Sequence, residues 1–359
     1  MIELFRPSVP PIEKYLPYIK KVDENRMYSN FGPMQSEFKE RLSNLYGMKA
    51  EQLELFSSGT TALIAALHVL RSPQRPYCLL PSWTFVATVH AAVAAGLEPV
   101  FVDVDAQSMQ VTQAELSALP PHILEQASVA LLVAPFGATL NLEGMDRLSK
   151  KFGFSVLCDC AASFESVRAP FFPTVISLHA TKMFGIGEGG LLMSSDESLI
   201  QKTHTYINFG FESGRQAKYS GINGKLSEFH AAVGMGGLDA WAESRDLYYS
   251  RAKIYLDTSK KLNIRLQSGW GTEWLSSTCV IQLPSPETKL HAVLKLNQAS
   301  IQCRDWWNQG CHREPAFANV LTPIGLKNTE YLAQTTLGIP FFRDINANQA
   351  EEVFQALQP

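Results

Sequence analysis

Short apolar runs alternate with helix-length segments between residues 52 and 160, and this alternation constrains the fold more than any other feature of the sequence. Continuous apolar strands separated by helices of about ten or more residues are typical of a parallel sheet with helices on both faces. The pattern therefore predicts an α/β architecture, in which ligands bind at the C-terminal ends of the strands. The predicted strands are residues 76–80, 99–104, 129–134 and 154–159, and the predicted helices are residues 59–70, 87–95 and 142–152.

The pattern changes near residue 240. Residues 241–262 predict one long helix, and the apolar run at 278–283, with the residues that follow 302, indicates a smaller α+β unit. Because the first 25 residues precede the first strand, we expect them to pack against that smaller unit. The predicted organisation is an N-terminal segment at 1–25, a large domain at 26–240 and a small C-terminal domain at 241–359.

Length, composition and charge exclude several classes of protein. The chain has 359 residues, of which 46% are hydrophobic and 18% charged, so it is too apolar for intrinsic disorder. The net charge of −3 lacks the basic excess of a nucleic-acid-binding protein. We find no apolar run of about 18 residues that would span a membrane and no signal-peptide pattern. Six cysteines in a chain of this length predict reduced thiols, so we expect a soluble cytoplasmic enzyme.

A turn of small residues precedes the predicted helix at 59–70. Ser58, Gly59 and Thr60 stand at the helix start, where free N–H groups and the positive end of the helix dipole form an anion site. Glycine there lets a phosphate approach closely. A plain helix cap by Ser58 or Thr60 explains the same residues.

Two further positions carry chemistry. Asp159 stands where a buried strand ends, as a carboxylate that pairs with a buried cation would, although a helix cap or a structural ion pair is the alternative. Its neighbours Cys158 and Cys160 lack a second ligand pair, so no metal site is predicted. Lys182 follows a Ser-x-His turn and precedes a glycine-rich segment. A partly buried lysine is a good amine nucleophile, whereas a surface lysine at a loop edge is the alternative.

Taken together, these residues are the set that pyridoxal phosphate (PLP) requires. The cofactor needs an anion site for its phosphate, a carboxylate facing its ring nitrogen and an amine for a Schiff base. A helix start, Asp159 and Lys182 supply them in chain order.

The chain resembles the DegT/StrS-type nucleotide-sugar aminotransferases, a fold type I family that depends on PLP. The resemblance extends from about residue 32 to residue 238 and more weakly to the C-terminus. It implies a mostly parallel seven-stranded sheet between helices, a smaller C-terminal α+β domain and aminotransferase activity. Five segments occur in the order and spacing of the family: SSGTTAL, PSWTFVAT, PVFVDVD, SLHATK with GEGG, and GINGKLSEFHAAVG.

The resemblance assigns cofactor roles to individual residues. Lys182 matches the Schiff-base lysine and Asp159 the partner of the ring nitrogen. Gly59 and Thr60 match the phosphate-binding turn, and Ser177 matches a further phosphate ligand.

Other matched positions concern the ring and the neighbouring subunit. Phe85 falls where an aromatic side chain stacks on the cofactor, with Trp83 as the competing candidate. Ala162 stands where many members carry Gln or His, which removes one hydrogen bond worth about 1 kcal/mol. Asn223 matches a residue that reaches the phosphate of the neighbouring subunit, which implies a homodimer. Glu188 belongs to the GEGG signature, and we assign it no chemical role.

The C-terminal segment lies where family members close the substrate site. Arg304 and Arg313 are candidates to bind a diphosphate, because guanidinium binds phosphate bidentately. Trp306 or Trp307 would stack on a base or sugar, unless they fill the core of the small domain. His312 belongs to the same candidate set.

The implied reaction is transamination of a nucleotide-linked sugar with glutamate as amino donor. The segment at 221–225 resembles a subgroup that aminates dTDP-linked 4-keto-6-deoxy sugars, and some relatives with His in place of the lysine are dehydratases. Lys182 therefore favours transamination, in biosynthesis of a surface polysaccharide or another glycan. Another fold type I enzyme that acts on free amino acids, or a non-catalytic PLP-binding regulatory relative, remains the alternative.

Overall fold

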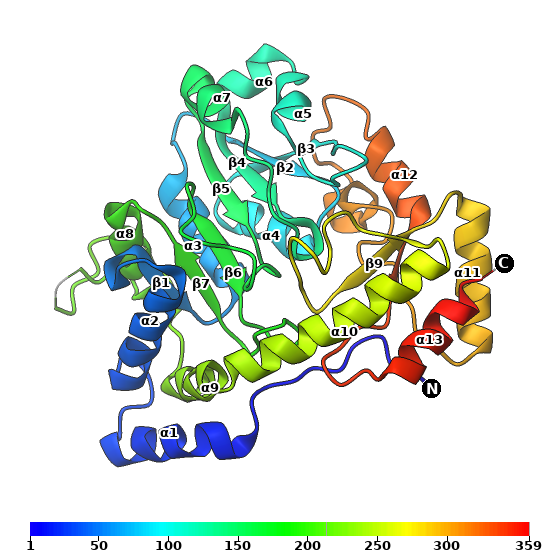
Figure 1. Ribbon diagram of the computed structural model, residues 1–359. Helices are drawn as coiled ribbons and strands as arrows, with labels where there is room; N and C mark the ends of the chain where they lie inside the picture. Colours follow the sequence, from blue (N-terminus) through cyan, green and yellow to red (C-terminus); the bar gives the residue numbers. More distant parts are fainter. Residues whose placement is uncertain (213, 359) are drawn as a thin grey trace.

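A seven-stranded sheet forms the centre of the molecule in a computed structural model, which describes residues 1–212 and 214–358 (Figure 1). The strand order is β1-β7-β6-β5-β4-β2-β3, and only β7 runs antiparallel to its neighbours. This confirms the predicted mostly parallel sheet. The strands are β1 (Leu53–Phe56), β2 (Tyr77–Pro81), β3 (Glu98–Val102), β4 (Ala127–Val133), β5 (Ser155–Asp159), β6 (Thr174–Ser177) and β7 (Gly190–Met193).

Helices cover both faces of this sheet, which is why its strands are apolar throughout. Alternate residues of β4 belong to different hydrophobic cores: Val129 and Leu131 pack with α3 and α4, whereas Ala130 and Leu132 face the opposite side. The helices of this part are α2 (Pro33–Tyr46), α3 (Gly59–Leu70), α4 (Val86–Ala94), α5 (Gln113–Ser117), α6 (Pro121–Glu125), α7 (Met145–Phe152), α8 (Glu197–Ile207) and α9 (Glu228–Asp239).

The long helix α10 (Trp241–Lys261) leads from α9 to a smaller α+β unit (Figure 1). That unit has a three-stranded antiparallel sheet in the order β10-β9-β8. Its elements are β8 (Arg265–Leu266), β9 (Cys279–Gln282), α11 (Pro286–Gln298), α12 (Lys327–Thr335), β10 (Thr336–Ile339) and α13 (Ala347–Ala356). Short 3₁₀ helices are η1 (Ala50–Gln52), η2 (Pro135–Gly137), η3 (Cys311–Arg313) and η4 (Pro315–Phe317).

The N-terminal segment contacts both parts of the molecule. Ile2 pairs with Ile301 of the C-terminal unit, whereas α1 (Ile12–Asn25) packs along α9 beneath the large sheet (Figure 1). The C-terminal half also returns to the large sheet, because Leu321 forms a bridge with Val100 of β3. The domain limits at residues 25 and 240 stay a prediction. Within residues 1–212 and 214–358, no helix has the length and apolar character needed to cross a membrane.

Candidate active site

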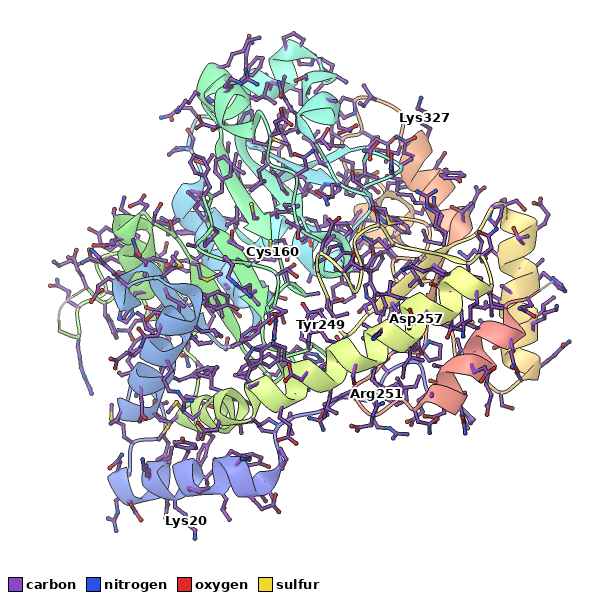
Figure 2. The ribbon with its side chains drawn as sticks, in the orientation of Figure 1. Lys20, Cys160, Tyr249, Arg251, Asp257 and Lys327 are labelled. Carbon is purple, nitrogen blue, oxygen red and sulfur yellow. The ribbon has the colours of Figure 1, made fainter. Side chains whose placement is uncertain are left out.

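A cavity of about 470 Å³ lies at the C-terminal ends of the parallel strands. Val133, Asp159 and Ser177, at or near the ends of β4, β5 and β6, line it together with the start of α3. Residues from the C-terminal unit close it from the other side. Figure 2 labels Cys160, which directly follows Asp159 and marks this end of β5 between the sheet and α10. The cavity lies where ligands bind in open α/β sheets.

Asp159 is buried at the end of β5, with 5% of its surface exposed. Its Oδ2 accepts a hydrogen bond of 2.8 Å from the Thr88 hydroxyl, and its Oδ1 accepts one of 3.2 Å from the Ala161 N–H. Burial raises the pKa of this carboxyl, and these hydrogen bonds with the charge of Lys182 offset part of that rise. A buried carboxylate of this kind is stabilised by a cation placed in the cavity.

Lys182 lines the same cavity, in the turn between β6 and β7. The turn is fixed by a hydrogen bond from the Lys182 N–H to the His179 carbonyl, at 2.9 Å. Burial lowers the pKa of the Lys182 amine, and the charge of Asp159 opposes that effect. No hydrogen bond or ion pair joins its Nζ to any of the described residues. Burial therefore favours the neutral form of this amine, which is the form that reacts as a nucleophile.

The start of α3 forms a cradle of small residues at the cavity wall. Ser58 is the N-cap, and its Oγ accepts a hydrogen bond of 3.1 Å from the Thr61 N–H. A Cβ on Gly59 would lie 3.0 Å from the Cβ of Ser177, and one on Gly190 would lie 2.6 Å from the carbonyl oxygen of Ser58. Gly190 thus leaves no room for a Cβ, and Gly59 leaves little. The cradle suits a phosphate at a helix N-terminus, and the capping role of Ser58 is compatible with it.

The two aromatic candidates for ring stacking lie in different places. Phe85 lines the cavity and is 59% exposed. Trp83 is 2% exposed and packs edge-on against Phe136 and Trp307, outside the cavity wall. Geometry therefore favours Phe85 over Trp83. Ala162 also lines the cavity.

Asn223 is not brought into this cavity. It is exposed and forms a bridge with Asn208, in a segment beside α8. A role for Asn223 at the phosphate of a neighbouring subunit stays a prediction.

The C-terminal candidates divide into two groups. Arg304, Trp306 and Trp307 line the cavity. Arg313 and His312 do not. The chain turns between the two groups at Gly310, whose φ of 88° is in the left-handed region, and the next residue, Cys311, donates its N–H to the Ser82 carbonyl.

His312 and Arg313 have structural partners instead. The Nδ1 of His312 lies 2.7 Å from the Ser82 hydroxyl, and Arg313 forms an ion pair of 2.6 Å with Glu330. Arg313 lines a separate polar cavity of about 750 Å³, which contains neither Lys182 nor Asp159. The prediction that these two residues act at the substrate site is therefore not supported by their positions.

Sequence reasoning missed several residues at the cavity. Thr88 donates a hydrogen bond to Asp159 and was not predicted. The only feature of the sequence that could have marked it is its spacing of four residues from Thr84, with which it shares a hydrogen bond. Phe136 lines the cavity with a φ of 57°, which is unusual for a bulky residue. Phe5 comes from the N-terminal segment, where no motif marked it. Glu188, to which we assigned no role, lines the wall with its Oε1 3.5 Å from the Nε2 of His179.

These residues fit PLP in chemistry and in layout. The cavity combines a phosphate cradle at a helix N-terminus, a buried carboxylate without an ion-pair partner among the described residues, and a lysine of lowered pKa. Those are the three protein groups that the cofactor uses.

Comparison with known proteins supports this conclusion. The protein Rv3402c of Mycobacterium tuberculosis is 29% identical over 99% of this chain and 89% of its own length. A dTDP-4-amino-4,6-dideoxy-D-glucose transaminase of Shigella dysenteriae is 27% identical over 98% of this chain and 97% of its own. A solved structure from Bacillus cereus, assigned as a PLP-dependent aminotransferase, has a TM-score of 0.91 at 27% identity and covers 99% of both chains.

The fold and the site thus define a PLP-dependent aminotransferase. The DegT/DnrJ/EryC1/StrS aminotransferase family matches residues 12–358, and the chain belongs to that family. The family and the cofactor expected from the sequence are confirmed.

Proposed function

We propose that this enzyme transfers an amino group from glutamate to the ketone of a nucleotide-linked deoxysugar, with a dTDP-4-keto-6-deoxyhexose as the preferred substrate. The Shigella dysenteriae relative, which matches nearly the whole chain, is named for a dTDP-linked amino sugar. The variant segment at 221–225 resembles enzymes of the same substrate class.

One observation carries the transaminase reaction: Lys182 and Asp159 line one cavity and their pKa values are shifted by the same burial in opposite directions. PLP, when bound, supplies a ring that accepts electrons from the carbon that loses a proton. Lys182 would hold the cofactor, and its amine would move the proton between the α-carbon of the donor and the C4′ carbon of the cofactor.

The other residues of the site bind and orient. Asp159 keeps a proton on the ring nitrogen, and Thr88 keeps Asp159 in position. Gly59, Thr60 and Ser177, which line the cavity, would hold the phosphate, and Phe85 would stack on the ring.

Assembly and location complete the proposal. The enzyme acts as a homodimer, in which Asn223 is exposed and available to the neighbouring active site. It works in the cytoplasm, where cysteines stay reduced. All six cysteines lie within the described residues and are free thiols. The amino sugar enters the biosynthesis of a lipopolysaccharide or another glycan.

The test is an absorbance spectrum of the purified, PLP-loaded protein before and after glutamate, followed by a dTDP-4-keto-6-deoxy sugar. We expect glutamate to remove the band of the lysine-linked cofactor and the keto sugar to restore it. Lys182→Ala should abolish both changes, whereas Lys202→Ala, an exposed lysine on α8, should change neither.

Other outcomes separate the alternatives. Turnover of free amino acids without any keto sugar would indicate a different fold type I reaction. A bound cofactor that no amino donor converts would indicate a regulatory protein instead.

A further inference from the structure

Arg304 lies against two neighbouring aromatic rings at the wall of the cofactor cavity. Its guanidinium carbon lies 5.3 Å from the ring centre of Phe5 and 5.1 Å from the ring centre of Trp306. The two rings are 6.0 Å apart and inclined at 39°, and all three residues line the cavity. A cation over an aromatic face is stabilised by the negative charge of that face.

The three residues of this cluster are positioned by backbone pairing between distant segments. The Ile2 N–H donates to the Ser300 carbonyl at 3.0 Å, and the Gln302 N–H donates to the Ile2 carbonyl at 2.9 Å. Arg304 pairs in both directions with Gly338 of β10, at 3.1 and 2.9 Å. The N-terminal segment and the small sheet thus fix Phe5 and Arg304 relative to each other.

Gly338 also makes room for Trp306. A Cβ at this position would overlap the indole Nε1 of Trp306, so only glycine admits the ring here. The cluster is therefore a fixed part of the cavity wall.

The charge of Arg304 is unbalanced. In the part of the chain that the structure describes, no acidic side chain lies within 4.0 Å of its guanidinium. Among the described residues that line the cavity, the other lysine or arginine is Lys182, which the proposed function assigns to the cofactor. Because the two ring centres are only 6.0 Å apart, both rings lie toward one side of the guanidinium. Its N–H groups donate no hydrogen bond to any described residue, so they are free to bind an anion.

Two anionic substrates enter this one cavity in turn in the proposed reaction. The amino donor carries a carboxylate, and the nucleotide sugar carries a diphosphate. We propose that Arg304 binds the carboxylate of the donor and the diphosphate of the acceptor alternately, and that Phe5 is the positioning residue that keeps its guanidinium facing the cavity. This inference rests on the proposed function and deepens it.

The test measures binding without turnover, by calorimetric titration of the PLP-loaded protein with inorganic pyrophosphate and, separately, with glutarate. Arg304→Gln should weaken both ligands by about 10- to 100-fold, as expected for loss of a hydrogen bond between charged groups. Phe5→Leu should weaken both by about two- to fivefold, and Phe5→Tyr should restore them. The control is Arg6→Gln, because Arg6 pairs with Glu3, stacks on Phe342 and does not line the cavity.

Turnover kinetics give a second readout. Phe5→Leu should raise KM for both substrates and leave kcat nearly unchanged, with an unfolding temperature close to that of the wild type. A purely structural role of Phe5 would lower the unfolding temperature without this KM pattern and would overturn the proposal.

Further outcomes are equally decisive. If Arg304→Gln weakens only one of the two ligands, or neither, the shared anion site is refuted. If both ligands weaken but no keto sugar is aminated, the anion site stands and the proposed substrate is wrong.

Discussion

Thr88 donates a hydrogen bond of 2.8 Å from its hydroxyl to Oδ2 of Asp159, so the carboxylate is held by the first turn of α4. The Thr84 hydroxyl lies 2.8 Å from that of Thr88 and extends this chain of hydrogen bonds. Both threonines are buried. The segment that presents Phe85 to the cavity therefore also fixes Asp159, the group that we propose faces the ring nitrogen.

Replacing Thr88 by Val should slow transamination and shift its pH dependence. The hydroxyl stabilises the ionised form of Asp159, so its loss raises a pKa that burial has already raised. We expect the acidic limb of the kcat/KM profile to move up by about one pH unit. Thr88→Ser, which keeps the hydroxyl, should behave like the wild type, and an unchanged profile for Thr88→Val would contradict the role given to this hydrogen bond.

Gly190→Ala should weaken cofactor binding, because Gly190 packs against the turn that forms the phosphate cradle. The added Cβ would lie 2.6 Å from both the Ser58 carbonyl oxygen and the Gly59 nitrogen, so the turn before α3 must move. We expect a loss of about 1–3 kcal/mol in stability and a weaker affinity for PLP. Thermal unfolding and cofactor titration measure the two effects. Gly325→Ala, where the Cβ would meet nothing within 4 Å, should change neither.

Glu54→Gln should destabilise the fold at neutral pH and much less in acid. Burial alone would raise the pKa of Glu54, but the hydrogen bond from His204 at 2.8 Å and the charge of Lys39 at 3.3 Å outweigh it and lower the pKa. A carboxylate of lowered pKa stabilises the folded state above its usual value of 4.5, and this contribution disappears as the pH falls through the folded-state pKa.

We expect Glu54→Gln to cost about 1–3 kcal/mol at neutral pH. Denaturant unfolding at several pH values checks this. A difference from the wild type that stays constant down to the lowest pH would show that packing, not charge, is responsible.

Asp103→Ala should loosen the attachment of α12 to the large sheet. The carboxylate of Asp103 accepts hydrogen bonds from the N–H groups of Asn328 at 2.9 Å and Thr329 at 2.8 Å, and so acts as a helix cap from a distant strand end. Loss of such a cap costs about 0.5–2 kcal/mol, measurable by denaturant unfolding. Asp146→Ala, which removes an exposed pair with Lys150, should cost far less.

Much of the large sheet was predictable, because its signal is local. The helix predicted at 59–70 coincides with α3, and the predicted strands lie within one or two residues of β2, β4 and β5. Ser58 caps the helix through its own neighbour Thr61, and a continuous apolar run needs only burial on both faces to become a strand.

The walls of the cavity were harder to predict, because they come from pairing over long distances. Phe5 lies at the site because its segment pairs with distant parts of the chain: Ile2 forms a bridge with Ile301, and the Leu4 carbonyl accepts a hydrogen bond from the Phe341 N–H. Arg313 and Arg304 looked equivalent in sequence, but the turn at Gly310 between them carries Arg313 away. No local pattern records either relationship.

Both edges of the large sheet are covered by segments that are made later in the chain. Lys225 forms a bridge with Phe56 of β1, and Leu321 forms one with Val100 of β3 and accepts a hydrogen bond from the Phe101 N–H at 2.9 Å. During synthesis, the edge of β3 therefore stays unpaired until about 220 further residues have been made, because its partner is Leu321. Exposed strand edges pair readily with other chains. The nascent large sheet is thus most prone to aggregation in the interval before residue 321 arrives, and a fragment that stops at residue 240 would keep that vulnerability permanently.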